Sequence, residues 1–266
     1  MAWEEGSDAS EKINIAGRQR MLSQKMAKAA CFVGLGTNQE ASLAEVQDAH
    51  ASFGASLIAL RDGDAEQGLL KEGHQSVIDS LNAVEEDWAR YSTAISGVIE
   101  NPGTASSQLP VIAELNLPVL AKSNAAVQEM ERSYGGAGSV SEERARTINV
   151  AGKQRMLSQR AAKEFCFFAA GLEPEISRSR LVATVNEFDT AMSNLISGSG
   201  GLETPLPALV RDLERVQNIW ADVRKEYQSV IDGATPTEEQ IALVAERSPR
   251  LLNRMNRIVY VYSHLD

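Results

Sequence analysis

The sequence contains few of the residues on which several protein classes depend. Aromatic residues make up 5% of its 266 residues, with 19 Gly and 8 Pro, and this scarcity argues against an all-β or collagen-like protein. Two Cys and three His are too few for a zinc ribbon or a multi-histidine metal site. No stretch approaches 18 consecutive apolar residues, so we expect no transmembrane helix.

The charge balance is acidic, with 26 Lys and Arg against 36 Asp and Glu and a formal net charge of -10. This excludes a general affinity for nucleic acid or for an anionic membrane. Apolar material is abundant, because 43% of the residues are hydrophobic. That is enough for a sizeable core, in one large domain or in two of ordinary size.

An internal repeat organises the chain. Residues 13–33 read INIAGRQRMLSQKMAKAACFV and residues 148–168 read INVAGKQRMLSQRAAKEFCFF, so 14 of 21 positions are identical at an offset of 135. Weaker matches continue beyond this motif, with Trp88 equivalent to Trp220 at offset 132 and Pro118 to Pro249 at offset 131. We therefore expect two homologous halves, residues 1–135 and 136–266.

Each half has apolar spacing typical of helices rather than strands. The expected helices span residues 8–35, 39–61, 64–100 and 109–134, and then 140–171, 175–197, 205–232 and 236–264. The predicted fold is all-α, with two tandem antiparallel four-helix bundles that form an internal pseudo-dimer.

Three helix starts carry a capping box, a Ser or Thr followed three residues later by Glu. The pairs are Thr37 with Glu40, Ser139 with Glu142, and Thr235 with Glu238, the last with Pro236 at the first helical position. We also expect Pro118 and Pro249 each to kink or restart the helix that contains it.

This acidic chain concentrates basic residues in the two copies of the motif. Residues 12–39 contain five Lys or Arg and no acid, and residues 144–163 contain six and no acid. A single run of this kind is typical of a solvated helix face. Its recurrence in the best-matched segment favours a function.

Helical geometry places one arginine of each copy on a mostly apolar stripe. The stripes comprise Ile13, Gly17, Arg20, Gln24 and Cys31, and in the second copy Ile148, Gly152, Arg155, Gln159 and Cys166. A mid-helix Gly costs about 1 kcal/mol relative to Ala, which predicts that another backbone comes close. Tight helix packing alone also explains these glycines.

The string N-[IV]-A-G-[RK]-Q-R-M-L-S-Q resembles the signature of PilJ-type sensor domains, the N-terminal domains of type IV pili methyl-accepting chemotaxis transducers. It is also similar to the P-box of NarX-type nitrate/nitrite sensor kinases. The resemblance implies a periplasmic four-helix bundle. In single-copy members two chains pair through their first helices. A nitrate or nitrite ion lies between them, held by the Arg before Met and by the backbone near the Gly.

Carried over by position, the resemblance assigns the anion-binding arginines to Arg20 and Arg155. The remaining candidate ligand-binding residues are of two kinds. Small residues, Ala16, Gly17, Ala151 and Gly152, would let the two helix backbones come close beneath the anion, and polar residues, Arg18, Lys153, Gln24 and Gln159, complete the set. Because this chain holds two copies, we expect one anion between its first and fifth helices. Two facing guanidiniums repel each other when the site is empty, and a small oxyanion accepts hydrogen bonds from both.

The same resemblance implies a sensor that needs no cofactor and no metal. Its partners are a small inorganic anion and a downstream signalling protein. The first ten residues lack the basic start and apolar core of a secretory signal. The protein is therefore either cytosolic or exported by a signal that the sequence does not contain, and the resemblance favours the periplasm.

Other residues carry expectations of their own. Cys31 and Cys166 lie about 16 Å beyond the two arginines along their helices. We expect free buried thiols, and the alternatives are a disulfide between the halves and a redox or catalytic thiol. Trp88 and Trp220 are expected in the core. Lys28, about two turns beyond Arg20, is expected to contribute little to an anion site.

The alternative function is a helical interaction module whose basic helices bind an acidic protein partner. A sensor buries Arg20 and Arg155 at a contact between helices, whereas an interaction module exposes them. No Ser/His/Asp arrangement, phosphate-binding loop or acid/base pair indicates an enzyme.

Overall fold

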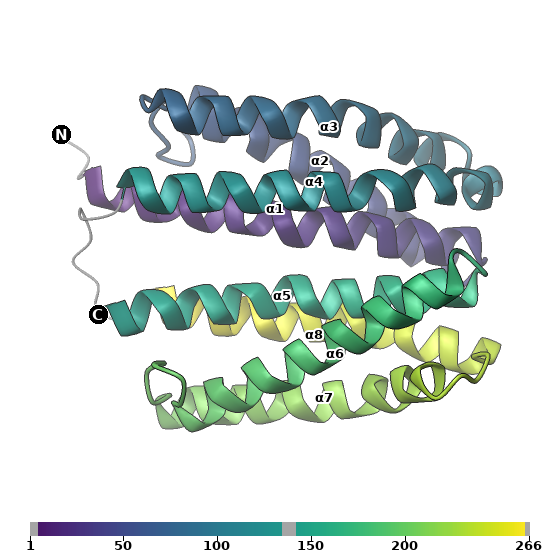
Figure 1. Cartoon of the computed structure of the whole chain (residues 1–266). Coiled ribbons are helices and arrows are strands. Elements are labelled where there is room, and N and C mark those ends of the chain that lie inside the picture. Colours follow the sequence, from purple (N-terminus) through teal and green to yellow (C-terminus); the bar gives the residue numbers. More distant parts are fainter. Residues whose placement is uncertain (1–4, 135–141, 264–266) are drawn as a thin grey trace.

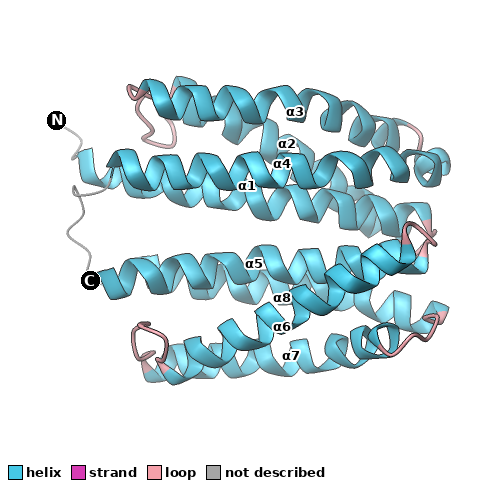
Figure 2. Cartoon of the chain, in the orientation of Figure 1, coloured by secondary structure: helices cyan, strands magenta, loops and turns pink. Residues whose placement is uncertain are grey.

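The computed structural model describes residues 5–134 and 142–263, which form helices and no β-strand (Figure 2). The helices are α1 (Glu5–Gly34), α2 (Gln39–Asp62), α3 (Gln75–Glu100), the 3-10 turn η1 (Pro102–Thr104), α4 (Ala105–Tyr134), α5 (Glu142–Ala169), α6 (Pro174–Ser197), α7 (Pro207–Ile231) and α8 (Glu238–Ser263). The all-α prediction is confirmed. The predicted division at residues 135 and 136 and the capping residue Ser139 lie outside the described residues.

The helices form two antiparallel groups of four that lie side by side (Figure 1). In the first group α1 packs against α2 and α4, and α3 packs against α4. The second group repeats this arrangement, with α5 against α6 and α8, and α7 against α8. Helices α1 and α5 run in the same direction and pack along each other, so the two motif helices form the contact between the groups.

The third helix begins later than expected. Residues 64–74 were predicted to be helical, but α3 begins at Gln75, and the preceding chain makes an antiparallel bridge between Asp64 and Leu69. The Asp64 carboxylate accepts the backbone N–H groups of Glu66 and Gln67 at 2.9 and 3.2 Å. Such a local side-chain acceptor competes with helical hydrogen bonds, and this is why the segment turns.

The capping boxes predicted at Thr235 and Thr37 do not form. Helix α8 starts with a reciprocal box between Thr237 and Gln240, two residues after the predicted pair. Helix α2 is preceded by Asn38 in the left-handed conformation, with no side-chain cap. Sequence spacing alone did not distinguish between neighbouring Thr-x-x-Glu/Gln pairs.

The prolines do not divide the helices that contain them. Pro118 lies inside α4 and Pro249 inside α8, and both helices continue past them. In α4 the Asn116 amide donates to the carbonyls of Ile112 and Ala113, in the turn before Pro118. This side chain supplies hydrogen bonds where a proline disturbs the helical pattern.

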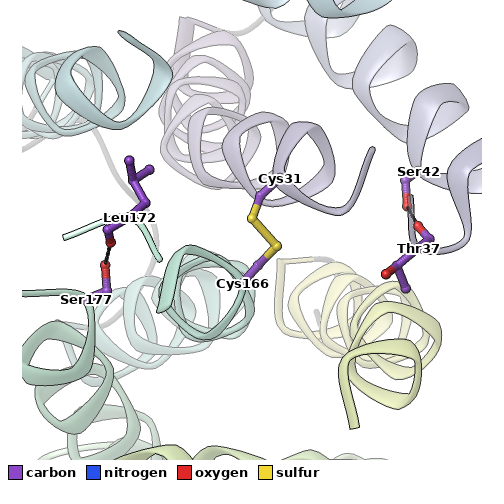
Figure 3. Close-up of a disulfide and its surroundings, with 6 residues drawn as sticks. All are labelled: Cys31, Thr37, Ser42, Cys166, Leu172 and Ser177. Carbon is purple, nitrogen blue, oxygen red and sulfur yellow. Dashed lines mark hydrogen bonds between the residues drawn. A yellow bond between two sulfur atoms is a disulfide. The ribbon is translucent and has the colours of Figure 1, made fainter. Parts of the chain in front are cut away.

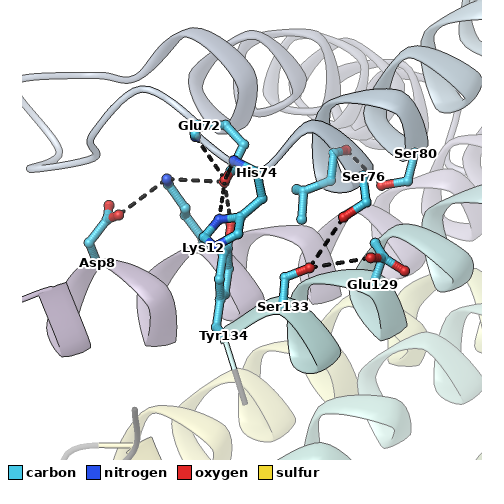
Figure 4. A network of polar contacts seen from close by, with 11 residues as sticks. Asp8, Lys12, Glu72, His74, Ser76, Ser80, Glu129, Ser133 and Tyr134 are labelled. Carbon is cyan, nitrogen blue, oxygen red and sulfur yellow. Dashed lines mark hydrogen bonds and ion pairs between the residues drawn. The ribbon is translucent and has the colours of Figure 1, made fainter. Parts of the chain in front are cut away.

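A buried ionic network closes one end of the first bundle (Figure 4). Lys12 Nζ lies 3.2 Å from Glu72 Oε2 and 3.1 Å from Asp8 Oδ2. The Tyr134 hydroxyl donates to Glu72 Oε2, and the His74 backbone N–H donates to Glu72 Oε1 at 2.8 Å. Burial opposes ionisation of Glu72, but these donors lower its pKa to about 2. The network joins α1, the loop before α3 and the end of α4.

The two tryptophans pack in equivalent places, as expected. Phe53 stacks on Trp88 with ring centroids 4.3 Å apart, and Phe188 stacks on Trp220 at 3.8 Å. Trp220 is buried and Trp88 is half-buried against the core. These pairs link α2 to α3 in the first bundle and α6 to α7 in the second. The contact between the bundles is made by α1 and α5.

Candidate functional site

A disulfide between equivalent residues joins α1 to α5 (Figure 3). Cys31 and Cys166 are bonded, with their Cα atoms 6.1 Å apart, and both side chains are fully buried. The expectation of free thiols is therefore wrong. Two parallel helices in register bring equivalent positions opposite each other, and this Cα separation is one that a disulfide spans.

Arg155 lies in the middle of α5, close enough to Arg18 and Arg20 on α1 for their charges to act on it. Its side chain is 7% exposed, and among the described residues it makes no ion pair. Its Nε reaches only the Gly152 carbonyl of its own helix, at 3.5 Å. Burial, together with the smaller effects of the positive charges of Arg18 and Arg20, lowers the pKa of Arg155 to about 10. The structure therefore brings the two predicted arginines together.

Arg20 has a more polar environment than its counterpart. It is half-buried, and its Nη1 donates to Asn124 Oδ1 on α4 at 3.0 Å. Burial lowers its pKa, while the nearby Glu131 carboxylate acts in the opposite direction. At the offset of 131 found for Pro118 and Pro249, the counterpart of Asn124 is Met255, which has no polar acceptor of this kind. The site is therefore asymmetric, with Arg20 anchored and Arg155 not.

The two glycines make room for the arginines rather than for another backbone. A Cβ built on Gly17 would lie 3.4 Å from Arg20 Nη2, and one on Gly152 would lie 3.6 Å from Arg155 Nη2. No atom of a neighbouring helix lies within 4 Å of either Cβ position. The close approach predicted for these glycines is absent. Instead, each guanidinium folds back over the glycine one turn earlier.

The other predicted residues fall into a buried set and an exposed set. Ala16, Ala151, Gln24 and Gln159 are fully buried along the contact. Gln24 Oε1 has no hydrogen-bond partner in the described part of the chain.

Arg18 and Lys153, at equivalent exposed positions, have different neighbours. Arg18 is close enough to lower the pKa of Arg155. Lys153 pairs with Glu187 on α6 and so turns away from the contact.

Lys28 lies at the contact between the two halves. Its ammonium is fully buried and donates to Glu45 Oε1 at 2.7 Å and to Gln159 Oε1 at 2.8 Å. It therefore reaches from the first half into the second. Its counterpart Lys163 reaches in the other direction, to Asn116 Oδ1 on α4 at 2.8 Å.

Sequence reasoning missed Asn124 and these crossing lysines. The lysines carried a signal, because they recur at the repeat offset in the basic windows. Asn124 carried none, since its partner lies 104 residues away and its equivalent differs.

The arrangement is a cluster of three cations, of which Arg155 is buried, Arg20 is half-buried and Arg18 is exposed. The positive charges of Arg18 and Arg20 act on Arg155, and no carboxylate of the described residues offsets the charge of Arg155. A buried charge without a counterion is strongly destabilising, and an anion removes that penalty through charge-assisted hydrogen bonds. No cluster of His, Cys, Asp or Glu in the described part of the chain could hold a metal ion.

Both halves match the same family, described as the type IV pili methyl-accepting chemotaxis transducer N-terminal domain, over residues 1–111 and 138–246. The chain belongs to the PilJ family. A part of this PilJ chain is similar to methyl-accepting chemotaxis protein McpN of Pseudomonas aeruginosa, with 34% identity over 94 residues. That alignment covers 35% of this chain and 17% of the relative, so the chain spans a small part of the relative's length.

Membership identifies this PilJ chain as a sensor-type domain of a chemotaxis transducer family, which is not a family of enzymes. Among the helices that the structure describes, none combines the length and apolarity needed to cross a bilayer.

Proposed function

We propose that this PilJ chain is a periplasmic sensor for a small inorganic oxyanion, nitrate or nitrite, held between Arg20 and Arg155. The observation that carries the proposal is the buried guanidinium of Arg155, which no carboxylate in the described residues neutralises. The similarity of the motif to the P-box of nitrate/nitrite sensor kinases supports the same ligand.

The asymmetry of the pair suits a monovalent anion. Arg20 is already held by Asn124 and acted on by Glu131, whereas Arg155 has only its own backbone. An anion bound mainly to Arg155, with a second contact to Arg20, neutralises the more destabilised charge first. A planar oxyanion presents two or three acceptors to the planar guanidinium forks.

The disulfide defines how binding would be transmitted. It ties α1 to α5 about 16 Å beyond the arginines, so the helices cannot separate there. Drawing the two guanidiniums together therefore moves the parts of α1 and α5 that precede the disulfide. Small displacements of packed helices are an established means of reporting ligand binding to a signalling partner.

The alternative, a module that binds an acidic protein through exposed basic helices, fits the burial less well. Arg155, Lys28 and Lys163 are buried, so the most strongly basic face is turned inward. That leaves Arg18 and Lys153 as exposed cations of the motif, and Lys153 is already paired.

Calorimetric titration with nitrate, nitrite, chloride and sulfate at fixed ionic strength tests the proposal. We expect nitrate or nitrite to bind saturably and chloride to bind much more weakly. Ligand at 100 times its dissociation constant stabilises the fold by roughly 2.7 kcal/mol if it binds only the native state.

Arg20→Ala and Arg155→Ala should abolish binding, whereas Lys25→Ala is the matched control. Lys25 is a half-buried cation on the same helix, five residues beyond Arg20. If Lys25→Ala weakens nitrate binding as much as Arg20→Ala, a diffuse positive field is responsible and the two-arginine site is wrong.

A further inference from the structure

A cavity of about 400 Å³ lies in the second bundle, on the side of α5 away from α1. Its walls are the first part of α5, the last part of α6 and the loop that follows α6. Arg146 precedes Arg155 by nine residues, which places it about 13 Å away along α5 and on the opposite face. The cavity is therefore separate from the contact between the two halves.

The cavity combines one cation with neutral polar groups and apolar surface. Arg146 is exposed at its rim and makes no ion pair or hydrogen bond with any described residue. Asn186, Thr190 and Asn194 are spaced four residues apart, so they share one face of α6. Apolar lining comes from Val150, Ala191 and Leu202.

The loop after α6 is built around this arginine. Gly198, Gly200 and Gly201 all have positive φ. A Cβ on Gly201 would lie 2.6 Å from Arg146 Nη1, so a side chain there would displace the guanidinium. The Glu203 N–H donates to Thr147 Oγ1 at 2.8 Å, which ties the loop to α5 next to Arg146.

Comparison of the two repeats shows that this chemistry belongs to the second repeat alone. At the offset of 135, Arg146 corresponds to Glu11, so the cation is replaced by an acid. The polar residues of α6 correspond to three alanines, with Asn186, Thr190 and Asn194 matched by Ala51, Ala55 and Ala59. The two repeats therefore differ at four positions around this one cavity. The first repeat has an acid and three alanines there, whereas the second has a cation and three hydrogen-bonding side chains.

We infer that this cavity is a second ligand site, for a small organic carboxylate that also carries a hydroxyl group. The guanidinium of Arg146 receives the carboxylate, a pairing for which its planar fork is suited. The Asn194 amide nitrogen, which makes no hydrogen bond to a described residue, and the Thr190 hydroxyl receive the hydroxyl group. The carbon skeleton lies on Val150 and Leu202. The volume falls within the range of small-molecule sites.

Glu187 also lines the cavity but does not exclude an acid. Its carboxylate pairs with Lys153, so these two charges cancel. The net charge of the lining is then positive because of Arg146.

Lactate is a suitable probe, because it combines a carboxylate, a hydroxyl and a methyl group. Titration of isotope-labelled protein, followed by amide NMR at fixed ionic strength, should give saturable shifts at residues 146, 190 and 200. Arg146→Gln should weaken lactate binding at least tenfold. Arg178→Gln removes a charge that is already paired with Glu175 and serves as the matched control.

Propionate, which lacks the hydroxyl, should bind at least several-fold more weakly than lactate. The site is refuted if lactate gives no saturable shift at these amides, or if Arg146→Gln and Arg178→Gln weaken it equally. Nitrate binding in Arg146→Gln and lactate binding in Arg155→Ala should both be unchanged. The two sites can therefore fail independently.

Discussion

At the scale of single residues, the unequal environments of the two motif arginines dominate. Arg155 is buried with no counter-charge in the described residues, whereas Arg20 has Asn124 and lies near Glu131. A buried charge without a partner opposes folding, and replacing it with an apolar side chain of similar length removes that cost.

We expect Arg155→Met to stabilise the anion-free protein by about 1–3 kcal/mol, measured by chemical denaturation in low-chloride buffer. Arg20→Met should be neutral or destabilising, because it leaves the Asn124 carbonyl without its donor. A greater loss of stability from Arg155→Met than from Arg20→Met would contradict the idea that the buried charge of Arg155 destabilises the fold.

Glu72 should make the stability of the protein depend on pH in the acid range. Its pKa in the folded protein is about 2, below the ordinary value of 4.5, so it stabilises the fold above pH 4.5 and loses that contribution as the pH falls toward 2. We expect Glu72→Gln to cost on the order of 1–2 kcal/mol at pH 7, since the neighbouring exposed His74 shows that water screens part of the network.

The free energies of unfolding of the two proteins should therefore converge between pH 4.5 and pH 2. A difference that stays constant over this range would mean that Glu72 contributes packing rather than charge. Glu40→Gln, which changes an exposed carboxylate on α2 of the same bundle, is the matched control.

At the scale of elements, the contact between α1 and α5 is held by a covalent bond and by polar bridges. Lys28 bonds to Gln159 across the contact, and Lys163 bonds to Asn116 on α4. Buried polar bridges of this kind have defined partners, so they favour one register of the two helices over others.

Removal of the disulfide should lower stability without disturbing this register. We expect the double variant Cys31→Ser and Cys166→Ser to lose roughly 2–5 kcal/mol, because the bond closes a long loop between residues 135 positions apart. Native protein should resist thiol alkylation until it is reduced and unfolded. Rapid alkylation of unreduced protein would show that the bond is absent in solution.

At the scale of the whole molecule, one chain carries two copies of a motif that meet at one place. Arg20 and Arg155 come from different halves, so the proposed anion site needs both halves. Titration should therefore give a stoichiometry of one nitrate per chain, and the affinity for nitrate should not change when the protein is diluted. Two nitrates per chain, or binding that weakens as the protein is diluted, would place the site within one half or between chains.

The sequence was sufficient for features that depend on local spacing. Helical periodicity predicted the eight helices, and only the start of α3 was displaced substantially, because the Asp64 turn is a side-chain effect that periodicity does not report. The repeat also identified Arg20 and Arg155 as equivalent, and the structure places them together. The roles of the glycines and of Lys28 were missed, since these depend on where side chains turn after the helices pack.

What the sequence determined by itself is the all-α fold of two similar halves and the equivalence of residues between them, because both follow from a repeat with helical spacing. Tertiary structure decided the partners. Cys31 met Cys166 because α1 and α5 pack in parallel and in register. Arg20 gained Asn124 from 104 residues away, while Arg155 gained no such partner. The packing of α4 against α1 gave Arg20 a partner that Arg155 lacks, because residues distant in sequence become neighbours only when their helices pack.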